Sequence, residues 1–183
     1  MTTKKYAALL RGINVGGAKK VPMAELREVL TDLGLTGVQT YLQSGNAVFT
    51  SPEKDPGALA RELERAVEAR FGFRVACLVV DGEYLRAVAE ACPFPAAELE
   101  GKQLHATFLS AQPGEERFAS IDGPAYLPEE YRIGDRVVYL YAPDGLGRSK
   151  LGEALHRPAV LKGIDATTRN WNTVVKLVEL TAG

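Results

Sequence analysis

The stretch RGINVGGAKKVPMAELREVL, residues 11–30, joins a glycine-rich basic loop to a helix that opens with proline. The run YAALLRGI before it (Tyr6–Ile13) is short and apolar and is bounded by glycine, which is typical of a buried strand. In the run after it, apolar residues recur on one face of a helix, and Pro22 suits the first turn. The stretch therefore predicts a strand, a loop and a helix in that order.

The residues that follow contain two more β-rich runs, an amphipathic helix and a further strand. VQTYLQ and NAVFTS flank the dipeptide Ser44-Gly45, which predicts a β-hairpin. Asp55 and Pro56 open the helix DPGALARELERAVEARFG, and Gly72 ends it. RVACLVV then has the composition of another buried strand. The order β-α-β-β-α-β is the split βαβ, or ferredoxin-like, pattern.

The second half of the chain repeats this order approximately, after a linking helix over DGEYLRAVAEAC. HATFLSA predicts a strand, PGEERFASI a short helix and YRIGDRVVYLYA a hairpin. RSKLGEALHRPAVLKG predicts a helix that is interrupted at Pro158. In TTRNWNTVVKLVEL the apolar residues have helical spacing, so we expect a C-terminal helix capped by Thr168 or Asn170 that departs from the repeat.

Together these elements predict an α+β chain built from two similar ferredoxin-like subdomains of the βαββαβ type. The first subdomain covers residues 1–82. The second, residues 83–183, is diverged and carries the added C-terminal helix. A length of 183 residues with 46% hydrophobic side chains suits one domain or two small ones.

Composition restricts the classes of function. The formal net charge is −1, which gives no global signal for nucleic-acid or membrane binding, although residues 1–50 carry six basic and three acidic side chains. Cys77 and Cys92 have no CxxC spacing, and no metal-ligand pattern joins them to His105 and His156, so we expect no metal and no cofactor. No apolar run reaches the length of a membrane span, which favours a cytoplasmic protein.

The predicted topology brings two polar loops to one place. In a βαββαβ unit, the loop after the first strand and the hairpin between the second and third strands lie at the same end of the sheet. RGINVGGAKK and Gln43–Asn46 should therefore share one sheet edge. Their candidate ligand-binding residues are Arg11, Asn14, Gly16, Gly17, Lys19, Lys20, Gln43, Ser44 and Asn46.

These residue types suit an anionic or polar ligand. Glycine lets a ligand approach backbone N–H groups, a helix N-terminus favours anions, and lysine and arginine add charge. Side-chain amides offer paired donors and acceptors suited to the edge of a base. The alternative is a tight turn with solvated lysines, because GINVGG matches neither GxGxxG nor a P-loop. Both interpretations stay open at this point.

The segment TTRNWNT contains a third group of candidates, Arg169, Asn170, Trp171 and Asn172. Trp171 either belongs to the core or stacks on a base while Arg169 contacts phosphate. No serine lies in a GxSxG setting beside a histidine, so no catalytic residue can be named. Whether the protein is an enzyme therefore stays open.

Three motifs together resemble the bacterial family catalogued as domain of unknown function 1697: ALLRGINVGGAKKVPMAELREVL, TYLQSGNAVF and RNWNTVVKL. They occur in this order over essentially the whole chain. The resemblance implies two similar ferredoxin-like subdomains and no established activity, cofactor or catalytic residue. The family's signature residues in this sequence are Arg11, Gly12, Asn14, Gly16, Gly17, Gln43, Ser44, Gly45, Asn46, Arg169, Asn170, Trp171 and Asn172.

The leading hypothesis is a protein that binds a phosphorylated ligand, a nucleotide or nucleic acid, at the two neighbouring loops. The RNWNT segment would complete this site if it packs back across the halves. One alternative is an enzyme of unknown reaction that uses the same polar loops. The other is a structural or partner-binding protein whose signature loops lock the subdomains together.

Overall fold

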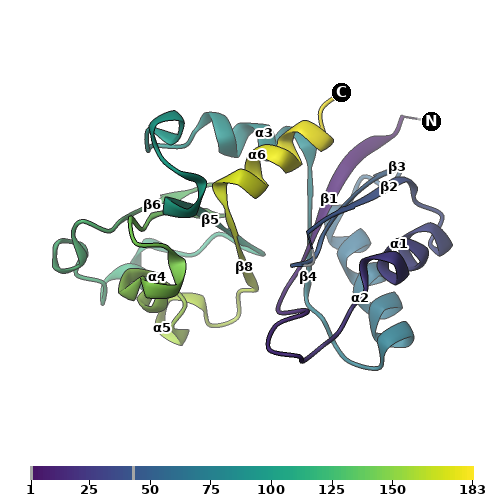
Figure 1. The fold of residues 1–183 in the computed structure, drawn as a ribbon, viewed down its shortest axis with the longest axis horizontal. Coiled ribbons are helices and arrows are strands. Elements are labelled where there is room, and N and C mark those ends of the chain that lie inside the picture. Colours follow the sequence, from purple (N-terminus) through teal and green to yellow (C-terminus); the bar gives the residue numbers. More distant parts are fainter. Residues whose placement is uncertain (1, 43) are drawn as a thin grey trace. The chain divides into compact units, whose positions relative to one another are not determined.

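The computed structural model describes residues 2–42 and 44–183 (Figure 1). The chain divides into two compact units. The first unit comprises the residues up to Arg86 together with Leu177–Gly183, and the second comprises Ala87–Lys176. Each unit contains one four-stranded antiparallel sheet, which confirms the mixed α/β class. The predicted boundary between residues 82 and 83 falls at the start of a helix and stays a prediction.

The first unit follows the element order that the sequence predicts. It contains β1 (Lys4–Leu10), α1 (Met23–Asp32), β2 (Thr36–Tyr41), β3 (Asn46–Ser51), α2 (Pro56–Phe71) and β4 (Cys77–Asp81). The strand order is β2-β3-β1-β4, so β1 is central and pairs with both β3 and β4. Both helices pack on one face of this sheet (Figure 1).

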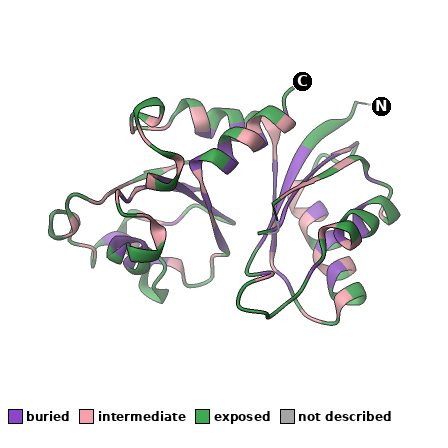
Figure 2. Ribbon diagram, viewed as in Figure 1, coloured by how far each residue is buried: buried purple, intermediate pink, exposed green. Residues whose placement is uncertain are grey.

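The core of the first unit lies between that sheet face and the two helices. Alternate residues of β1 (Tyr6, Ala8 and Leu10) are buried in it, as the period of two in a strand requires. α1 and α2 contribute the apolar faces of amphipathic helices (Figure 2). Asp55 caps α2, because its side chain accepts a hydrogen bond from the Gly57 N–H at 2.9 Å.

The second unit contains β5 (Leu104–Leu109), β6 (Glu130–Gly134), β7 (Val137–Tyr141), α4 (Lys150–Leu155), α5 (Pro158–Leu161) and β8 (Ala166–Asn170). Its strand order is β6-β7-β5-β8. Two further helices, α3 (Gly82–Glu90) and α6 (Trp171–Leu180), each contribute residues to both units. The predicted interruption at Pro158 is confirmed, since it separates α4 from α5.

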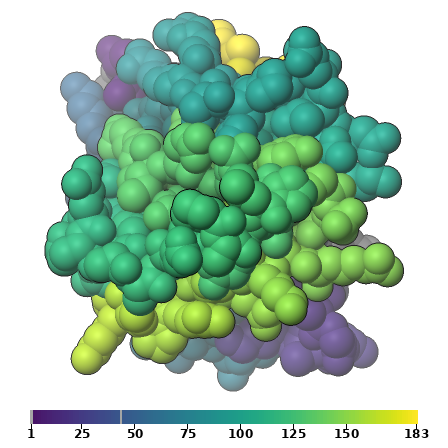
Figure 3. Space-filling model, turned by 90° about the vertical axis from the view of Figure 1, so that its left-hand side faces the viewer, coloured from purple at the N-terminus to yellow at the C-terminus, as the bar shows by residue number. Residues whose placement is uncertain are grey.

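The helix-covered face of the second sheet carries that unit's core. Val138 and Leu140 of β7 pack there with Leu151 and Leu155 of α4. Ser149 caps α4, because its hydroxyl oxygen accepts a hydrogen bond from the Gly152 N–H at 2.8 Å. Figure 3 looks onto the surface of this unit, where its middle residues (green) face the viewer.

The C-terminal segment begins with a strand that the sequence analysis does not predict. Ala166–Asn170 form the strand β8, antiparallel to β5, and do not belong to the final helix. Thr167 and Thr168 are β-branched and favour a strand, and the helical spacing begins only at Trp171. The first four residues of this segment, 167–170, therefore belong to the fourth strand of the sheet, and the helix begins at Trp171.

The sequence also predicts a short helix over residues 113–121, and the structure has shorter 3-10 helices there. Residues Glu115–Phe118 form a 3-10 helix, and a second one covers Gly123–Tyr126. Further single turns of this type cover Ala96–Glu98, Gly101–Gln103 and Leu146–Arg148. The link between β5 and β6 is thus made of short turns rather than of a full α-helix.

Candidate functional site

The loop between β1 and α1 forms a small hairpin of its own. The Ala18 N–H donates to the Val15 carbonyl at 3.0 Å, and these two residues form an isolated antiparallel bridge. Gly16 and Gly17 occupy the turn between them with φ of 59° and 79°. Two successive positive φ values are the requirement of a type I′ turn, which explains both glycines without a ligand.

The side chain of Asn14 closes the base of this hairpin. Its Nδ2 donates to the Val21 carbonyl at 3.0 Å, and its Oδ1 accepts from the Val21 N–H at 2.8 Å. Ile13 and Val21 on either side are buried in the core. Both ends of the amide therefore help to hold the loop, and Asn14 stabilises the hairpin.

The β2–β3 hairpin lies against the base of the first loop, as the topology predicts. The Leu10 N–H donates to the Gly45 carbonyl at 2.9 Å. Gly45 has φ of 97°, and a Cβ placed there would lie 2.8 Å from Ile13 Cδ1 and 2.9 Å from Leu10 Cβ. The two loops therefore pack together at their bases through a position that only glycine fits.

Asn46 has a structural role similar to that of Asn14. Its side chain is fully buried, and Nδ2 donates to the Tyr41 carbonyl at 2.8 Å and to Ser44 Oγ at 3.2 Å. These bonds fix the turn of the hairpin. Gln43, the remaining predicted residue of this loop, lies outside the described residues.

A third segment meets the two loops at the same end of the sheet. The Arg11 N–H donates to the Ala76 carbonyl at 3.0 Å, and Lys19 Nζ donates to the Arg74 carbonyl at 2.9 Å. Arg74 was not among the predicted site residues. Its position could have been inferred, because β4 is the antiparallel neighbour of β1 and the residues before it must lie beside the end of β1.

These three segments form what we call the basic end of the first unit. Segments 11–22, 42–46 and 72–76 contain four basic residues and no aspartate or glutamate. All four basic residues are exposed: Arg11, Lys19, Lys20 and Arg74. Of the acids near these segments, Glu25 and Glu28 of α1 pair with Arg70 at 3.2 and 2.8 Å. Glu64 of α2 accepts a hydrogen bond from the Cys77 N–H at 3.1 Å, beside the end of the third segment. The basic end therefore carries concentrated positive charge in a chain whose net charge is −1.

The RNWN residues lie in the second unit, and two of them are buried. Arg169 is on β8, where its Nη1 donates to Thr167 Oγ1 at 2.6 Å and to the Thr168 carbonyl at 3.0 Å. Burial lowers the pKa of Arg169 to about 10. Trp171 is 8% exposed and packs on Tyr139, with ring centroids 6.3 Å apart. Of the two interpretations of Trp171, the structure thus favours the core residue over the base-stacking platform.

The two asparagines of this motif lie at the start of α6. Asn170 caps the helix, because its Oδ1 accepts from the Thr173 N–H at 3.0 Å. This confirms one of the two predicted caps. Asn172 is exposed and lies so close to Gly101 that a Cβ at residue 101 would come within 2.3 Å of its side chain.

The imidazole of His105, on β5, is buried and lacks one of its hydrogen bonds. Among residues 2–42 and 44–183, its Nδ1 is the one buried side-chain nitrogen or oxygen with no hydrogen-bond partner. Burial lowers the pKa of His105 from its usual 6.5. The unfolded chain therefore binds a proton at pH values where the folded protein does not.

Acid should consequently destabilise the protein through His105. As the pH falls below 6.5, the unfolded state gains protons first, so the free energy of unfolding decreases. Urea unfolding measured across this pH range should show a smaller decrease in the free energy of unfolding for His105→Leu than for the parent protein. His156→Gln, which alters the chain's other histidine, is the control for the loss of an imidazole. An unchanged slope in His105→Leu would contradict the assignment.

The described part of the chain contains neither a membrane-spanning helix nor a cluster of metal-ligating side chains. No helix in residues 2–42 and 44–183 has the length and apolar character needed to cross a membrane. In the same residues, no three histidine, cysteine, aspartate or glutamate side chains converge as a set of metal ligands.

Comparison with known proteins places the chain in a family. No curated protein matches the sequence. A similar solved structure is the conserved bacterial protein SP0830 from Streptococcus pneumoniae, which is 26% identical, with coverage of 98% of this chain and 99% of that chain and a TM-score of 0.72. The family model described as protein of unknown function (DUF1697) matches residues 3–139, which include the whole basic end. The chain therefore belongs to the DUF1697 family, as predicted; the matched residues contain the first two motifs, and RNWNTVVKL lies outside them.

Proposed function

We propose that the protein binds nucleic acid in the cytoplasm, through phosphate contacts made by the basic end. The observation that carries this proposal is the grouping of four exposed cations on three segments that contain no acidic residue. Lysine and arginine that neutralise phosphates release condensed counterions, which is the main source of sequence-independent affinity for nucleic acids.

The geometry of the basic end favours an extended polyanion. Its cations stand on exposed loops, and the hairpin that carries Lys19 is held by the Asn14 amide and by the type I′ turn. α1 begins at Met23 without a side-chain cap, so its first backbone N–H groups add a favourable dipole. A preformed cationic surface of this kind can contact successive phosphates without folding on binding.

Binding is better supported than catalysis. The thiol in this region belongs to Cys77, at the start of β4, and it is buried. Burial, assisted by the Glu64 carboxylate, raises the pKa of Cys77 to about 12, so the thiolate does not form near neutral pH. Asn14 and Asn46 use their amides within the loops, which leaves them poorly placed to stabilise a reacting group.

We also infer that the two units are ferredoxin-like repeats. The strand orders β2-β3-β1-β4 and β6-β7-β5-β8 correspond element by element. In each unit, helices lie between the third and fourth strands along the chain. The diverged feature of the second unit is the link between its first two strands, where 3-10 turns replace an α-helix. This correspondence supports the repeat and the ferredoxin-like class.

Fluorescence anisotropy with a labelled single-stranded oligonucleotide tests the binding proposal. Arg11→Gln combined with Lys20→Gln removes two exposed charges from the basic end. We expect at least a tenfold loss of affinity at low salt, and a slope of log K against log salt that is smaller by about 1.4, for two lost contacts of about 0.7 each.

A charge-matched control separates this site from general electrostatics. Lys54→Gln combined with Arg65→Gln also removes two exposed charges from the first unit, outside the basic end. This control should keep most of the affinity and the parental salt slope. Equal losses in the two double variants, or no salt-dependent binding by the parent protein, would overturn the proposal.

A further inference from the structure

In the described part of the chain, the edge strand β6 of the second sheet pairs on one side only, with β7. The other neighbour of β7 is β5, and the residues that flank β7 show which of its groups face β5. The Ala142 N–H donates to the Gln103 carbonyl, and the Leu109 N–H donates to the Arg136 carbonyl. Because the direction of backbone groups alternates along a strand, the even-numbered residues of β7 are turned toward β5 and the odd-numbered residues toward β6.

The outward-facing backbone groups of β6 therefore belong to Tyr131 and Ile133. The residues opposite the odd-numbered positions of β7 are Glu130, Arg132 and Gly134, so β7 uses their N–H and C=O groups. The groups of Tyr131 and Ile133 point away from the sheet. The side chain of Arg132 agrees with this direction, because its Nη1 donates to the Tyr131 carbonyl at 2.8 Å. An edge of this kind can pair with a further strand.

β6 carries both signs of charge on one face. Glu130 and Arg132 are two residues apart, so their side chains share a face of the sheet, and they pair at 3.2 Å. If two β6 strands pair antiparallel about a two-fold axis at Tyr131, outward groups meet outward groups and Glu130 of each copy lies opposite Arg132 of the other. An axis at Arg132 would place the two arginines opposite each other, which is unfavourable. An axis at Ile133 would place Arg132 opposite Gly134, where it meets no charge.

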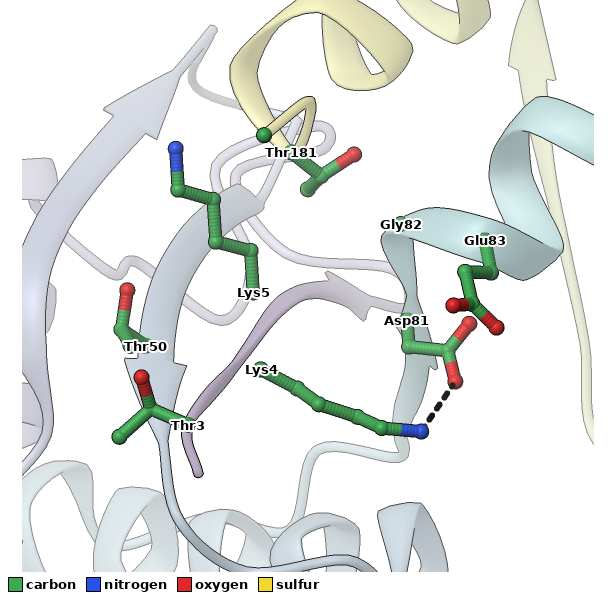
Figure 4. A pocket seen from close by; sticks show the side chains of 9 residues that line it. Thr3, Lys4, Lys5, Thr50, Asp81, Gly82, Glu83 and Thr181 are labelled. Carbon is green, nitrogen blue, oxygen red and sulfur yellow. Dashed lines mark ion pairs between the residues drawn. The ribbon is translucent and has the colours of Figure 1, made fainter. Parts of the chain in front are cut away.

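The other edge strands lack this combination of charges. Among the edge strands formed by residues 2–42 and 44–183, β2 has no charged residue and β8 has only Arg169, which is buried. β4 has only Asp81, and Lys4 of β1 lies 3.8 Å from its carboxylate (Figure 4). The pairing of β2 is also irregular between Thr36 and Gln39, a feature that protects a sheet edge. β6 is thus the edge strand best suited to pair with a copy of itself.

The same register covers exposed apolar side chains. A cavity of about 300 Å³ opens beside the start of β6, and Leu127, Glu129 and Tyr131 are among the residues that line it. With the axis at Tyr131, Ile133 of each copy lies opposite Glu129 of the other and therefore beside this cavity. Leu127 is 61% exposed and Ile133 is 38% exposed. Pairing thus buries apolar surface of the second unit in addition to joining the backbones.

We propose that the protein forms a symmetric dimer through β6, in which two four-stranded sheets join into one antiparallel sheet. Tyr131 of each copy exchanges backbone hydrogen bonds with Tyr131 of the other. Glu130 and Arg132 form two ion pairs across the axis, one on each side of it. The partner is a second copy of this chain because the charge pattern of β6 is complementary to itself. The paired strands are short, so the association is weak and depends on protein concentration.

Sedimentation velocity of the full chain over a range of concentrations tests for the dimer, and amide hydrogen exchange locates it. We expect a sedimentation coefficient that rises with concentration. The amides of Tyr131 and Ile133 should exchange more slowly as the dimer forms, because both donate across the axis. A chain that stays monomeric up to millimolar concentration would overturn the proposal. So would a dimer in which these two amides gain no protection.

Charge reversal tests the register. Arg132→Glu places acidic side chains opposite each other on both sides of the axis, and Glu130→Arg places basic side chains there. Each variant alone should therefore dimerise about tenfold more weakly than the parent protein. In an equimolar mixture of the two variants, every cross-strand pair again joins opposite charges, so heterodimers should form with about the parental affinity.

The mixture also controls for folding, because each chain keeps its own substitution there and a folding defect would persist. Arg157→Glu reverses another exposed arginine of the second unit and should dimerise like the parent protein. Parental dimerisation by Arg132→Glu, or the absence of heterodimers in the mixture, would overturn the proposal.

Discussion

Replacing Gly45 with alanine should lower the free energy of unfolding by about 2–5 kcal/mol. The backbone at Gly45 has φ of 97°, a conformation that costs an L-residue about 1–2 kcal/mol. The new methyl group would also lie 2.8 Å from Ile13 Cδ1 and 2.9 Å from Leu10 Cβ, and overpacking of this kind costs about 1–3 kcal/mol. Both neighbours are buried and cannot move into solvent.

Two further variants separate the backbone and packing contributions. Gly16→Ala has a similar positive φ of 59° but no atom within 4 Å of the new Cβ, so it should cost only about 1–2 kcal/mol. Ile13→Val removes the Cδ1 atom, so Gly45→Ala should be less destabilising in that background. Urea unfolding of the single and double variants measures all of these terms. Equal decreases in the free energy of unfolding for Gly45→Ala and Gly16→Ala would show that packing around Gly45 is unimportant.

Alkaline pH should destabilise the protein strongly through Cys77. Burial raises the pKa of this thiol from 9.0 to about 12. Between these two pH values the unfolded chain loses the thiol proton and the folded protein keeps it, so the free energy of unfolding falls as the pH rises. Three pKa units correspond to about 4 kcal/mol at about 1.36 kcal/mol per unit. This loss is complete only near pH 12.

Other buried groups also titrate in this range, so the effect of Cys77 must be measured by difference. Burial raises the pKa of Tyr139 to about 12, which adds to the loss of stability. The lowered pKa of Arg169 acts with the opposite sign, because the unfolded chain then binds more protons and stability rises above pH 10. Both contributions are the same in the parent protein and in Cys77→Ala, and they cancel when the two are compared.

The comparison variant is Cys77→Ala, with Cys92→Ala as the control for loss of a thiol. Cys77→Ala should be less stable than the parent near neutral pH, because it leaves a cavity in the core. As the pH rises above 9 the parent should lose this advantage, and the two unfolding free energies should converge and then cross. Parallel curves for the parent and Cys77→Ala would contradict the assigned pKa.

The order of elements in the first unit could be predicted because glycine and proline mark its boundaries. Asp55 and Pro56 begin α2, and Gly72 ends it, at the positions that the sequence indicates. At the C-terminus no such residue separates β8 from α6. Asn170 is the last residue of the strand and also the cap of the helix, so the change of period could not be located from the sequence.

The sequence predicted where the two loops of the basic end lie, but it did not predict the roles of their asparagine side chains. The topology alone brings the first loop beside the β2–β3 hairpin. The roles of Asn14 and Asn46 depend on which backbone groups come within hydrogen-bond distance, namely those of Val21 and Tyr41. A sequence pattern does not contain that information, because an amide that binds a ligand and an amide that braces a loop have the same composition.

The first unit is discontinuous in the sequence, and this affects how the protein is made. Leu177–Gly183 belong to that unit, yet they follow the whole of Ala87–Lys176 along the chain. During synthesis from the N-terminus, the second unit is therefore complete before the first one can be. Until residues 177–183 leave the ribosome, Lys5 has no Ala182 carbonyl to bind and Gly82 has no Thr181 beside it. The first-made part of the protein is thus the last to finish folding.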